Sequence, residues 1–243
     1  MTSRPVIGVL GGMGPEATVL LMHKIIRATP AEDDADHVPL LVDNNTQVPS
    51  RIAALVEGNG PSPAPVLVAM ARRLEAMGCA ALAMPCNTAH AYADDIRAAV
   101  RVPFLDMVQL AAAALAARLP QGGQVGMLGS TALGNVRLYE DPLATRALEL
   151  VYPARQPEVM QALRAFKRRA DDPSARAALR AAADDLVASG ADALLVACTE
   201  FSLATDVLPP AVPTVDALDA LVAAILETAA PAIVRNDAVE TMA

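Results

Sequence analysis

Short apolar runs alternate with longer amphipathic stretches along the chain, a pattern typical of strands and helices that follow one another in turn. The runs at residues 6–10, 80–86 and 193–198 are nearly uninterrupted, as in strands buried in a parallel sheet. The amphipathic stretches predict helices at residues 15–28, 66–77, 91–100, 111–119, 175–189 and 217–230. Because strands that alternate with helices form parallel sheets with right-handed crossovers, the pattern predicts an α/β fold.

This succession of elements occurs twice. Three matched pairs stand in the same order at separations of 118, 112 and 110 residues: Gly8 with Gly126, Cys86 with Cys198, and Pro103 with Pro213. The repetition predicts a pseudo-twofold internal duplication, with two similar three-layer α/β domains, mainly parallel sheets, and an active site in the interdomain cleft. We expect the first domain at residues 1–105 and the second at 106–213, with a C-terminal helix within 216–235 that packs back on the first.

Composition and charge exclude several classes of protein. Only 2% of the residues are aromatic and the net charge is -8, which argues against a nucleic-acid partner. Three cysteines without a Cys-x-x-Cys pair fit a reducing compartment, and three scattered histidines disfavour a metal site. No stretch has the roughly 18 uninterrupted apolar residues of a membrane span. We therefore expect a cytoplasmic protein with no membrane partner and no metal.

Lysine is scarce in this chain. The only lysines are Lys24 and Lys167, and neither follows a strand-like run. A pyridoxal phosphate enzyme needs a lysine for its Schiff base. The sequence therefore favours chemistry without a cofactor.

The candidate chemistry lies where two of the apolar runs end. Cys86 is followed by an Asn-Thr pair and Cys198 by a Thr-Glu pair. In open α/β sheets, ligands bind at the carboxyl ends of the strands, and a thiolate there is stabilised by the amides of the next helix. Cys79 lacks this context and is expected in the core. The sequence thus predicts two functional thiols, one on each wall of the cleft.

Other motifs leave alternatives open. The glycines from Gly8 to Gly14 are typical of a dinucleotide loop, but their spacing is Gly-x-x-Gly-Gly-x-Gly instead of Gly-x-Gly-x-x-Gly. Arg51 lies in a loop on the same sheet edge as Cys86 and is the best cationic candidate for a site. His90 is either a catalytic group or a hydrogen-bonded structural residue.

Three segments, at residues 11–18, 84–90 and 197–200, resemble the signature segments of the aspartate/glutamate racemase family. The aspartate racemase branch is the most similar, because Thr-Glu follows the second cysteine in place of Thr-His. The resemblance implies cofactor-independent racemisation of an acidic amino acid, aspartate or glutamate, by two α/β domains. It also implies a small acidic amino acid as the partner, and a homodimer.

The resemblance also implies roles for single residues. Cys86 and Cys198 would be the two bases, one on each face of Cα. The residues expected to bind the substrate are Asn87, Thr88 and Thr199 at the α-carboxylate, Asn45 and Arg51 from loop 44–51, Lys167 or Arg168 as a further cation, and Met13 and Glu200 from the signature segments.

Two departures from the family pattern concern the substrate. Residues 132–137 replace a Gly-Thr-x-x-Ser-Gly run, and Ser50 stands where an aspartate usually precedes the arginine. The first departure predicts an altered preference for the substrate side chain. Three alternatives to racemisation also remain. The first is a decarboxylase or isomerase of small dicarboxylic acids on the same fold. The second is a catalytically silent protein that binds acidic ligands, and the third is a redox pair formed by the two cysteines.

Overall fold

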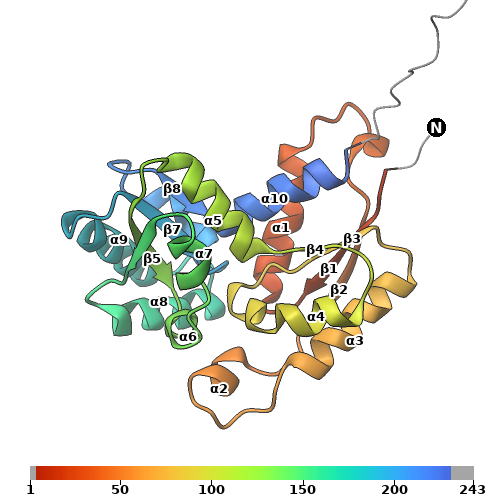
Figure 1. The fold of residues 1–243 in the computed structure, drawn as a ribbon, viewed down its shortest axis with the longest axis horizontal. Coiled ribbons are helices and arrows are strands. Elements are labelled where there is room, and N and C mark those ends of the chain that lie inside the picture. Colours follow the sequence, from red (N-terminus) through yellow and green to blue (C-terminus); the bar gives the residue numbers. More distant parts are fainter. Residues whose placement is uncertain (1–3, 231–243) are drawn as a thin grey trace, which may run out of the picture.

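The computed structural model describes residues 4–230 and contains two four-stranded parallel sheets (Figure 1). The first sheet has the strand order β2-β1-β3-β4 and the second the order β6-β5-β7-β8. Their bounds are β1 (Ile7–Gly11), β2 (Leu40–Asn44), β3 (Ala81–Ala83), β4 (Phe104–Leu105), β5 (Gly123–Gly129), β6 (Leu148–Val151), β7 (Ala193–Ala197) and β8 (Thr214–Asp216). All neighbouring strands are parallel, which confirms the predicted α/β fold class.

Helices connect the strands in both halves. The α-helices of the first half are α1 (Pro15–Ala28), α2 (Arg51–Leu55), α3 (Ala64–Ala76), α4 (Ala93–Ala99) and α5 (Met107–Arg118). Those of the second half are α6 (Thr131–Asn135), α7 (Glu140–Ala144), α8 (Gln156–Arg168), α9 (Pro173–Ala188) and α10 (Ala217–Thr228). Short 3-10 helices are η1 (Asp34–Asp36), η2 (Asn87–Tyr92) and η3 (Phe201–Val207). Among these described residues, no helix is both long and apolar enough to cross a membrane.

The duplication extends to the register of the strands. Gly8 pairs with Leu82, four residues before Cys86, and Gly126 pairs with Leu194, four residues before Cys198. A Cβ atom on either glycine would lie within 3.0 Å of the leucine side chain beside it. The covering helix is also close, with the Cβ atom of Leu74 in α3 at 3.2 Å for Gly8 and that of Leu186 in α9 at 3.0 Å for Gly126. Both positions therefore favour glycine for the same reason, which is the close packing of a helix and a leucine side chain over the strand.

The last helix of each half begins in the same way. Asp106 accepts hydrogen bonds from the amides of Val108 and Gln109 at the start of α5, and Asp216 accepts one from Leu218 at the start of α10. A carboxylate at this position satisfies amides that have no partner within the helix. Helix α5 accordingly begins at Met107, four residues earlier than the apolar periodicity predicts.

These two helices cross between the halves. Helix α10 contacts α1, β3 and β4 of the first half, while α5 contacts α7, β7 and β8 of the second, and the two helices contact each other. Figure 1 shows α1, α5 and α10 between the two sheets, with α3 and α4 outside one sheet and α8 and α9 outside the other. Each half therefore completes the inner layer of the other.

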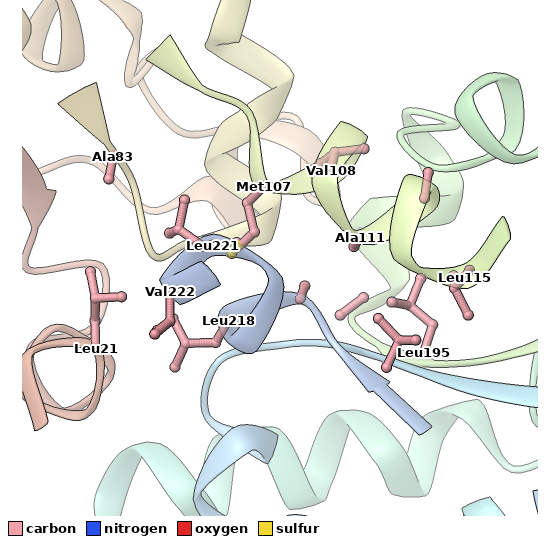
Figure 2. Packing of buried hydrophobic residues seen from close by; sticks show 14 of the residues in the cluster. Leu21, Ala83, Met107, Val108, Ala111, Leu115, Leu195, Leu218, Leu221 and Val222 are labelled. Atoms are coloured by element: carbon pink, nitrogen blue, oxygen red, sulfur yellow. The ribbon is translucent and has the colours of Figure 1, made fainter. Parts of the chain in front are cut away.

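A single apolar cluster fills the space between the sheets. It combines Met107, Ala111 and Leu115 of α5 with Leu218 and Leu221 of α10, all of them fully buried (Figure 2). Separate clusters lie under the outer helices of each half. The division of the chain into domains 1–105 and 106–213 stays a prediction, and residues 231–235 of the predicted last helix lie outside the described residues.

Several predicted boundaries differ from the structure. The stretch 91–100 begins earlier as the 3-10 helix η2 and becomes α-helical only at Ala93. The loop 44–51 leads into α2, because the Ser50 hydroxyl accepts a hydrogen bond from the Ala53 amide and caps the helix. Both differences arise from local hydrogen bonds, which apolar periodicity does not record.

Two adjacent isoleucines on α1 test the central cluster. Ile25 is 2% exposed within that cluster, whereas Ile26 is 51% exposed. We expect Ile25→Ala to lower the free energy of unfolding by about 2–5 kcal/mol because it leaves a cavity, and Ile26→Ala to change it by less than about 1 kcal/mol. Thermal denaturation measures both, with a shift of roughly 2–4 °C per kcal/mol for a chain of this size. Equal losses from the two variants would contradict the position assigned to α1.

Candidate functional site

A cavity lies where the carboxyl ends of the two sheets meet. The first half contributes the predicted site residues Met13, Arg51, Cys86, Asn87 and Thr88. The second half contributes Lys167, Cys198, Thr199 and Glu200. Both thiols therefore lie in one small cavity, each supplied by a different half of the chain.

Two of the predicted residues lie elsewhere. Asn45 packs its backbone over Gly12, where a Cβ atom would come within 2.3 Å of the Asn45 carbonyl carbon. Arg168 lines a separate groove between α8 and α9. Lys167 is the member of the Lys167–Arg168 pair that lines the cavity, because successive residues of a helix point about 100° apart.

Cys86 follows β3 by three residues, and its backbone is fixed by a buried histidine. His90 Nδ1 lies 2.9 Å from the Cys86 carbonyl oxygen, and its Nε2 lies 3.1 Å from the Met107 amide nitrogen. The Met107 amide donates, so Nε2 is the acceptor and Nδ1 carries the proton. Burial lowers the pKa of His90, which favours this neutral form. His90 thus joins the cysteine turn to the start of α5 and does not line the cavity.

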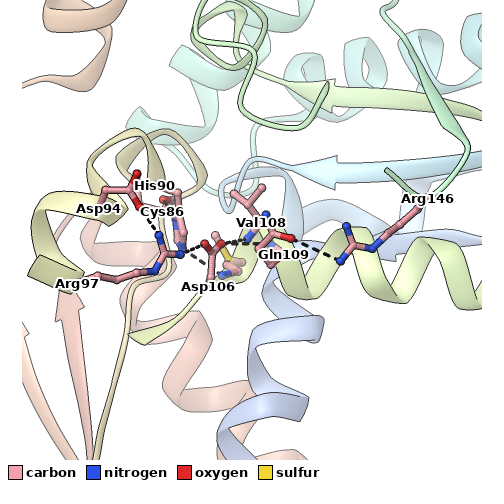
Figure 3. A network of polar contacts seen from close by, with 9 residues as sticks. Cys86, His90, Asp94, Arg97, Asp106, Val108, Gln109 and Arg146 are labelled. Atoms are coloured by element: carbon pink, nitrogen blue, oxygen red, sulfur yellow. Dashed lines mark hydrogen bonds and ion pairs between the residues drawn. The ribbon is translucent and has the colours of Figure 1, made fainter. Parts of the chain in front are cut away.

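Figure 3 shows the ion pairs around this turn. Arg97 pairs with Asp94 at 2.7 Å and also with Asp106, the residue that caps α5. The arginine and its partners hold α4 against the start of α5, beside His90. The turn that carries Cys86 is therefore supported from two neighbouring elements.

Asn87 is oriented by a tyrosine from the other half. The Tyr139 hydroxyl donates a hydrogen bond to Asn87 Oδ1 at 2.5 Å, and both side chains are buried. Burial raises the pKa of Tyr139 well above its usual value, so the hydroxyl keeps its proton. With Oδ1 occupied, Nδ2 of Asn87 is left without a partner among the described residues. Asn87 thus offers an N–H donor at the cavity wall.

Two other residues that line the cavity also have a buried polar atom without a partner within residues 4–230. These atoms are the Ser130 hydroxyl and Nε of Arg51. The other end of the arginine is occupied, since Nη2 donates to the Met13 carbonyl at 2.9 Å and Nη1 to the Pro49 carbonyl at 3.0 Å. Buried polar groups in proteins are usually paired. Three unpaired groups around one cavity therefore point to a polar ligand.

The sequence predictions did not include Ser130. It directly follows Gly129, which pairs with Ala197, the residue before Cys198. The register of β5 and β7 thus brings Ser130 next to the second cysteine. The signal in the sequence was its position at the end of an apolar run in the repeat.

Cys198 has a charged neighbour that Cys86 lacks among residues 4–230. Its Sγ donates a hydrogen bond to Glu200 Oε2 at 3.1 Å, and Glu200 Oε1 lies 3.6 Å from Lys167 Nζ. Burial, followed by the charge of Glu200 and this hydrogen bond, raises the pKa of the Cys198 thiol well above its usual value, while Lys167 lowers it. Cys198 is therefore held as a thiol, which is suited to donating a proton.

Metal ligation does not account for this group of side chains. Within the part of the chain that the structure describes, no three or more His, Cys, Asp and Glu residues are placed to hold a metal ion. The cavity instead combines two thiols with hydrogen-bond donors, two cations and one carboxylate. Such a set can bind carboxylates and move protons.

Comparison with known proteins agrees with this chemistry. The family described as Asp/Glu/Hydantoin racemase matches residues 10–225. The chain is 24% identical over 224 residues to the broad specificity amino-acid racemase RacX of Bacillus subtilis (strain 168). The alignment covers 86% of this chain and 92% of RacX.

Solved structures show the same relationship. The aspartate racemase of Picrophilus torridus is 31% identical, with a TM-score of 0.82 over 93% of this chain and 94% of that chain. A glutamate racemase of Francisella tularensis, solved in complex with D-glutamate, is 18% identical with a TM-score of 0.63 over 93% of this chain and 81% of that chain, which shows the shared fold alone. The chain therefore belongs to the Asp/Glu/Hydantoin racemase family and is an isomerase of the amino-acid racemase type.

Proposed function

We propose that the protein racemises an acidic amino acid without a cofactor, with Cys86 and Cys198 as the two groups that exchange protons with Cα. The observation that carries this proposal is the presence of both thiols in one cavity, at equivalent positions of the two halves. A racemase needs a proton acceptor on one face of Cα and a donor on the other, and two thiols supply both.

The proposed reaction has two proton transfers. The thiolate of one cysteine takes the α-proton, and the electron pair of the broken C–H bond is delocalised into the α-carboxylate. The thiol of the other cysteine then gives its proton to the opposite face of Cα. General acid and base groups each contribute typically 10²–10⁴-fold to such a rate, so the remaining acceleration must come from stabilised charge on the carboxylate.

The unpaired donors at the cavity wall supply that stabilisation. Asn87 Nδ2, the Ser130 hydroxyl and Arg51 Nε are buried and have no other partner among the described residues. Fixed donors in a site that excludes water stabilise developing negative charge without having to reorganise. Thr88 and Thr199 line the same cavity and offer two more hydroxyl groups.

The charges of the cavity support an acidic substrate. Arg51 and Lys167 are its two cations, one from each half, and an acidic amino acid carries two carboxylates. Of the relatives, one is named an aspartate racemase, which supports the same class, and another is named a broad specificity amino-acid racemase, which supports racemisation without naming a substrate.

The segment 132–137, which departs from the family pattern, favours a second substrate class. In the structure this segment belongs to α6 and the turn after it, and Leu133 is fully buried in the central cluster, so it offers the site no hydroxyl group. Racemisation of a less polar amino acid is therefore the second candidate. Two intact cysteine motifs disfavour the decarboxylase alternative, for which one thiol suffices.

Proton NMR in D₂O tests the function directly. We expect L-aspartate or L-glutamate, incubated with purified protein and no cofactor, to lose its α-proton signal while chiral chromatography detects the D-enantiomer. Exchange with L-alanine or L-methionine but with neither acid would favour the second candidate. Absence of exchange with any amino acid would contradict the proposal and favour a silent binding protein.

Replacement of either cavity cysteine tests the two-thiol mechanism. Because Cys86→Ala or Cys198→Ala removes one of the two proton-transferring groups, we expect the racemisation rate to fall by about 10²–10⁴-fold or more. The control is Cys79→Ala, since Cys79 is buried under Gly8 and does not line the cavity. Full activity in Cys86→Ala would rule the mechanism out. A dependence of activity on reductant cycling would instead support a redox pair.

The tyrosine that orients Asn87 provides a separate test. Tyr139→Phe removes the hydrogen bond to Asn87 Oδ1 and leaves the amide free to rotate. One hydrogen bond contributes about 0.5–1.5 kcal/mol, so we expect kcat/KM to fall roughly 2- to 12-fold. The matched control is Tyr152→Phe. The Tyr152 hydroxyl donates a hydrogen bond to Glu140, outside the cavity. Equal effects from the two variants would show that Tyr139 acts only on stability.

A further inference from the structure

We propose that Glu200 is a positioning residue that holds the Cys198 thiol in its protonated form, so that in the resting site Cys198 donates a proton and Cys86 accepts one. The positive charge of Lys167 opposes this effect of Glu200. The consequence for turnover rests on the proposed function, but the charge relationship among the three side chains can be tested without it.

The contacts of Glu200 divide between the thiol and the lysine. Oε2 accepts the hydrogen bond from Cys198 Sγ at 3.1 Å, and Oε1 faces Lys167 Nζ at 3.6 Å. The carboxylate is 8% exposed, so water screens its charge little, whereas the Lys167 side chain is 42% exposed. The other ionisable groups that line the cavity are Cys86 and Arg51. Glu200 is thus the only carboxylate among the lining residues, and it directly contacts one of the two thiols.

The two charged neighbours act on Cys198 in opposite directions. A buried thiolate next to a carboxylate is disfavoured by like charge, and only the protonated thiol can donate the hydrogen bond. Burial and Glu200 therefore raise the pKa of Cys198, while the positive charge of Lys167 lowers it. Removal of the Glu200 charge should therefore lower the pKa of the Cys198 thiol, and removal of the Lys167 charge should raise it.

The first half has no equivalent of Glu200. In the repeat, Cys86-Asn87-Thr88 corresponds to Cys198-Thr199-Glu200, so the neutral Thr88 stands in the position of the carboxylate. Within the described residues, the Cys86 sulfur has no hydrogen bond to an ionisable group, unlike Cys198. The two thiols are equivalent in position but not in charge environment.

The difference in charge environment determines which cysteine accepts a proton and which donates one. From the resting site, the Cα–H bond breaks, its proton passes to the Cys86 thiolate, and Cα takes the proton of the Cys198 thiol. Cys198 is then a thiolate beside the Glu200 carboxylate. Repulsion between the two charges favours uptake of a proton from water by Cys198, while Cys86 releases its proton to water. Both transfers balance, and the resting site is restored.

The rate of alkylation of Cys198 tests the charge relationship. Iodoacetamide reacts with the thiolate, and mass spectrometry measures its reaction with each cysteine separately over a range of pH. A neighbouring charge shifts a pKa by about 1–3 units. We therefore expect Glu200→Gln to accelerate Cys198 alkylation roughly tenfold or more at neutral pH, because the pKa of the thiol falls. We expect Lys167→Gln to slow the reaction, because that pKa rises.

A charge-matched control separates this effect from a general one. Arg164→Gln removes one positive charge from the exposed face of α8, away from the cavity, and should leave the alkylation profile of Cys198 unchanged. Glu200→Asp keeps the charge and should retain most of the wild-type profile.

The outcomes distinguish this inference from the proposed function. An unchanged profile in Glu200→Gln, or shifts of the same sign in Glu200→Gln and Lys167→Gln, would overturn the inference even in an active racemase. Opposite shifts in a protein that racemises no amino acid would support the charge relationship and contradict the proposed function.

Discussion

Burial of the apolar faces of α5 and α10 between the two sheets is the constraint on which the site depends. Each helix follows the last strand of its own half and packs against the sheet of the other half. Because residues of both helices belong to one fully buried cluster, the halves cannot separate without exposing that cluster to water. The distance between the two cysteine turns is therefore set by core packing and not by a flexible linker.

Charged contacts reinforce this packing at the helix starts. Lys24 of α1 reaches Asp216 at 3.3 Å and Asp219 at 2.5 Å, so an ion pair joins the first half to α10. Burial raises the pKa of Asp216, and Lys24 opposes that change. For Lys24, burial alone would lower the pKa, but the two carboxylates outweigh it. The same Asp216 caps α10 and accepts a hydrogen bond from Ser202, four residues after Cys198.

Much of the fold could be predicted from the sequence, because strands and helices produce short-range patterns of apolar residues. Apolar runs marked the strands, and the nearly constant separation of the matched glycines, cysteines and prolines marked the repeat. The partner of Asn87 could not be predicted in this way. Tyr139 lies 52 residues away in the other half, so the contact exists only after the halves have packed. The orientation of Lys167 likewise depends on how α8 is rotated against α9.

The site also explains why a duplicated chain need not keep identical halves. The two halves have the same residue where close packing requires it, as at the two glycines that face Leu82 and Leu194. The side chains after the cysteines, in contrast, line a cavity, so close packing does not require the same residues in both halves. A fully symmetric pair of thiols would have equal proton affinities, so nothing would favour one as donor and the other as acceptor. One carboxylate, placed beside one thiol, removes that equality without moving the backbone.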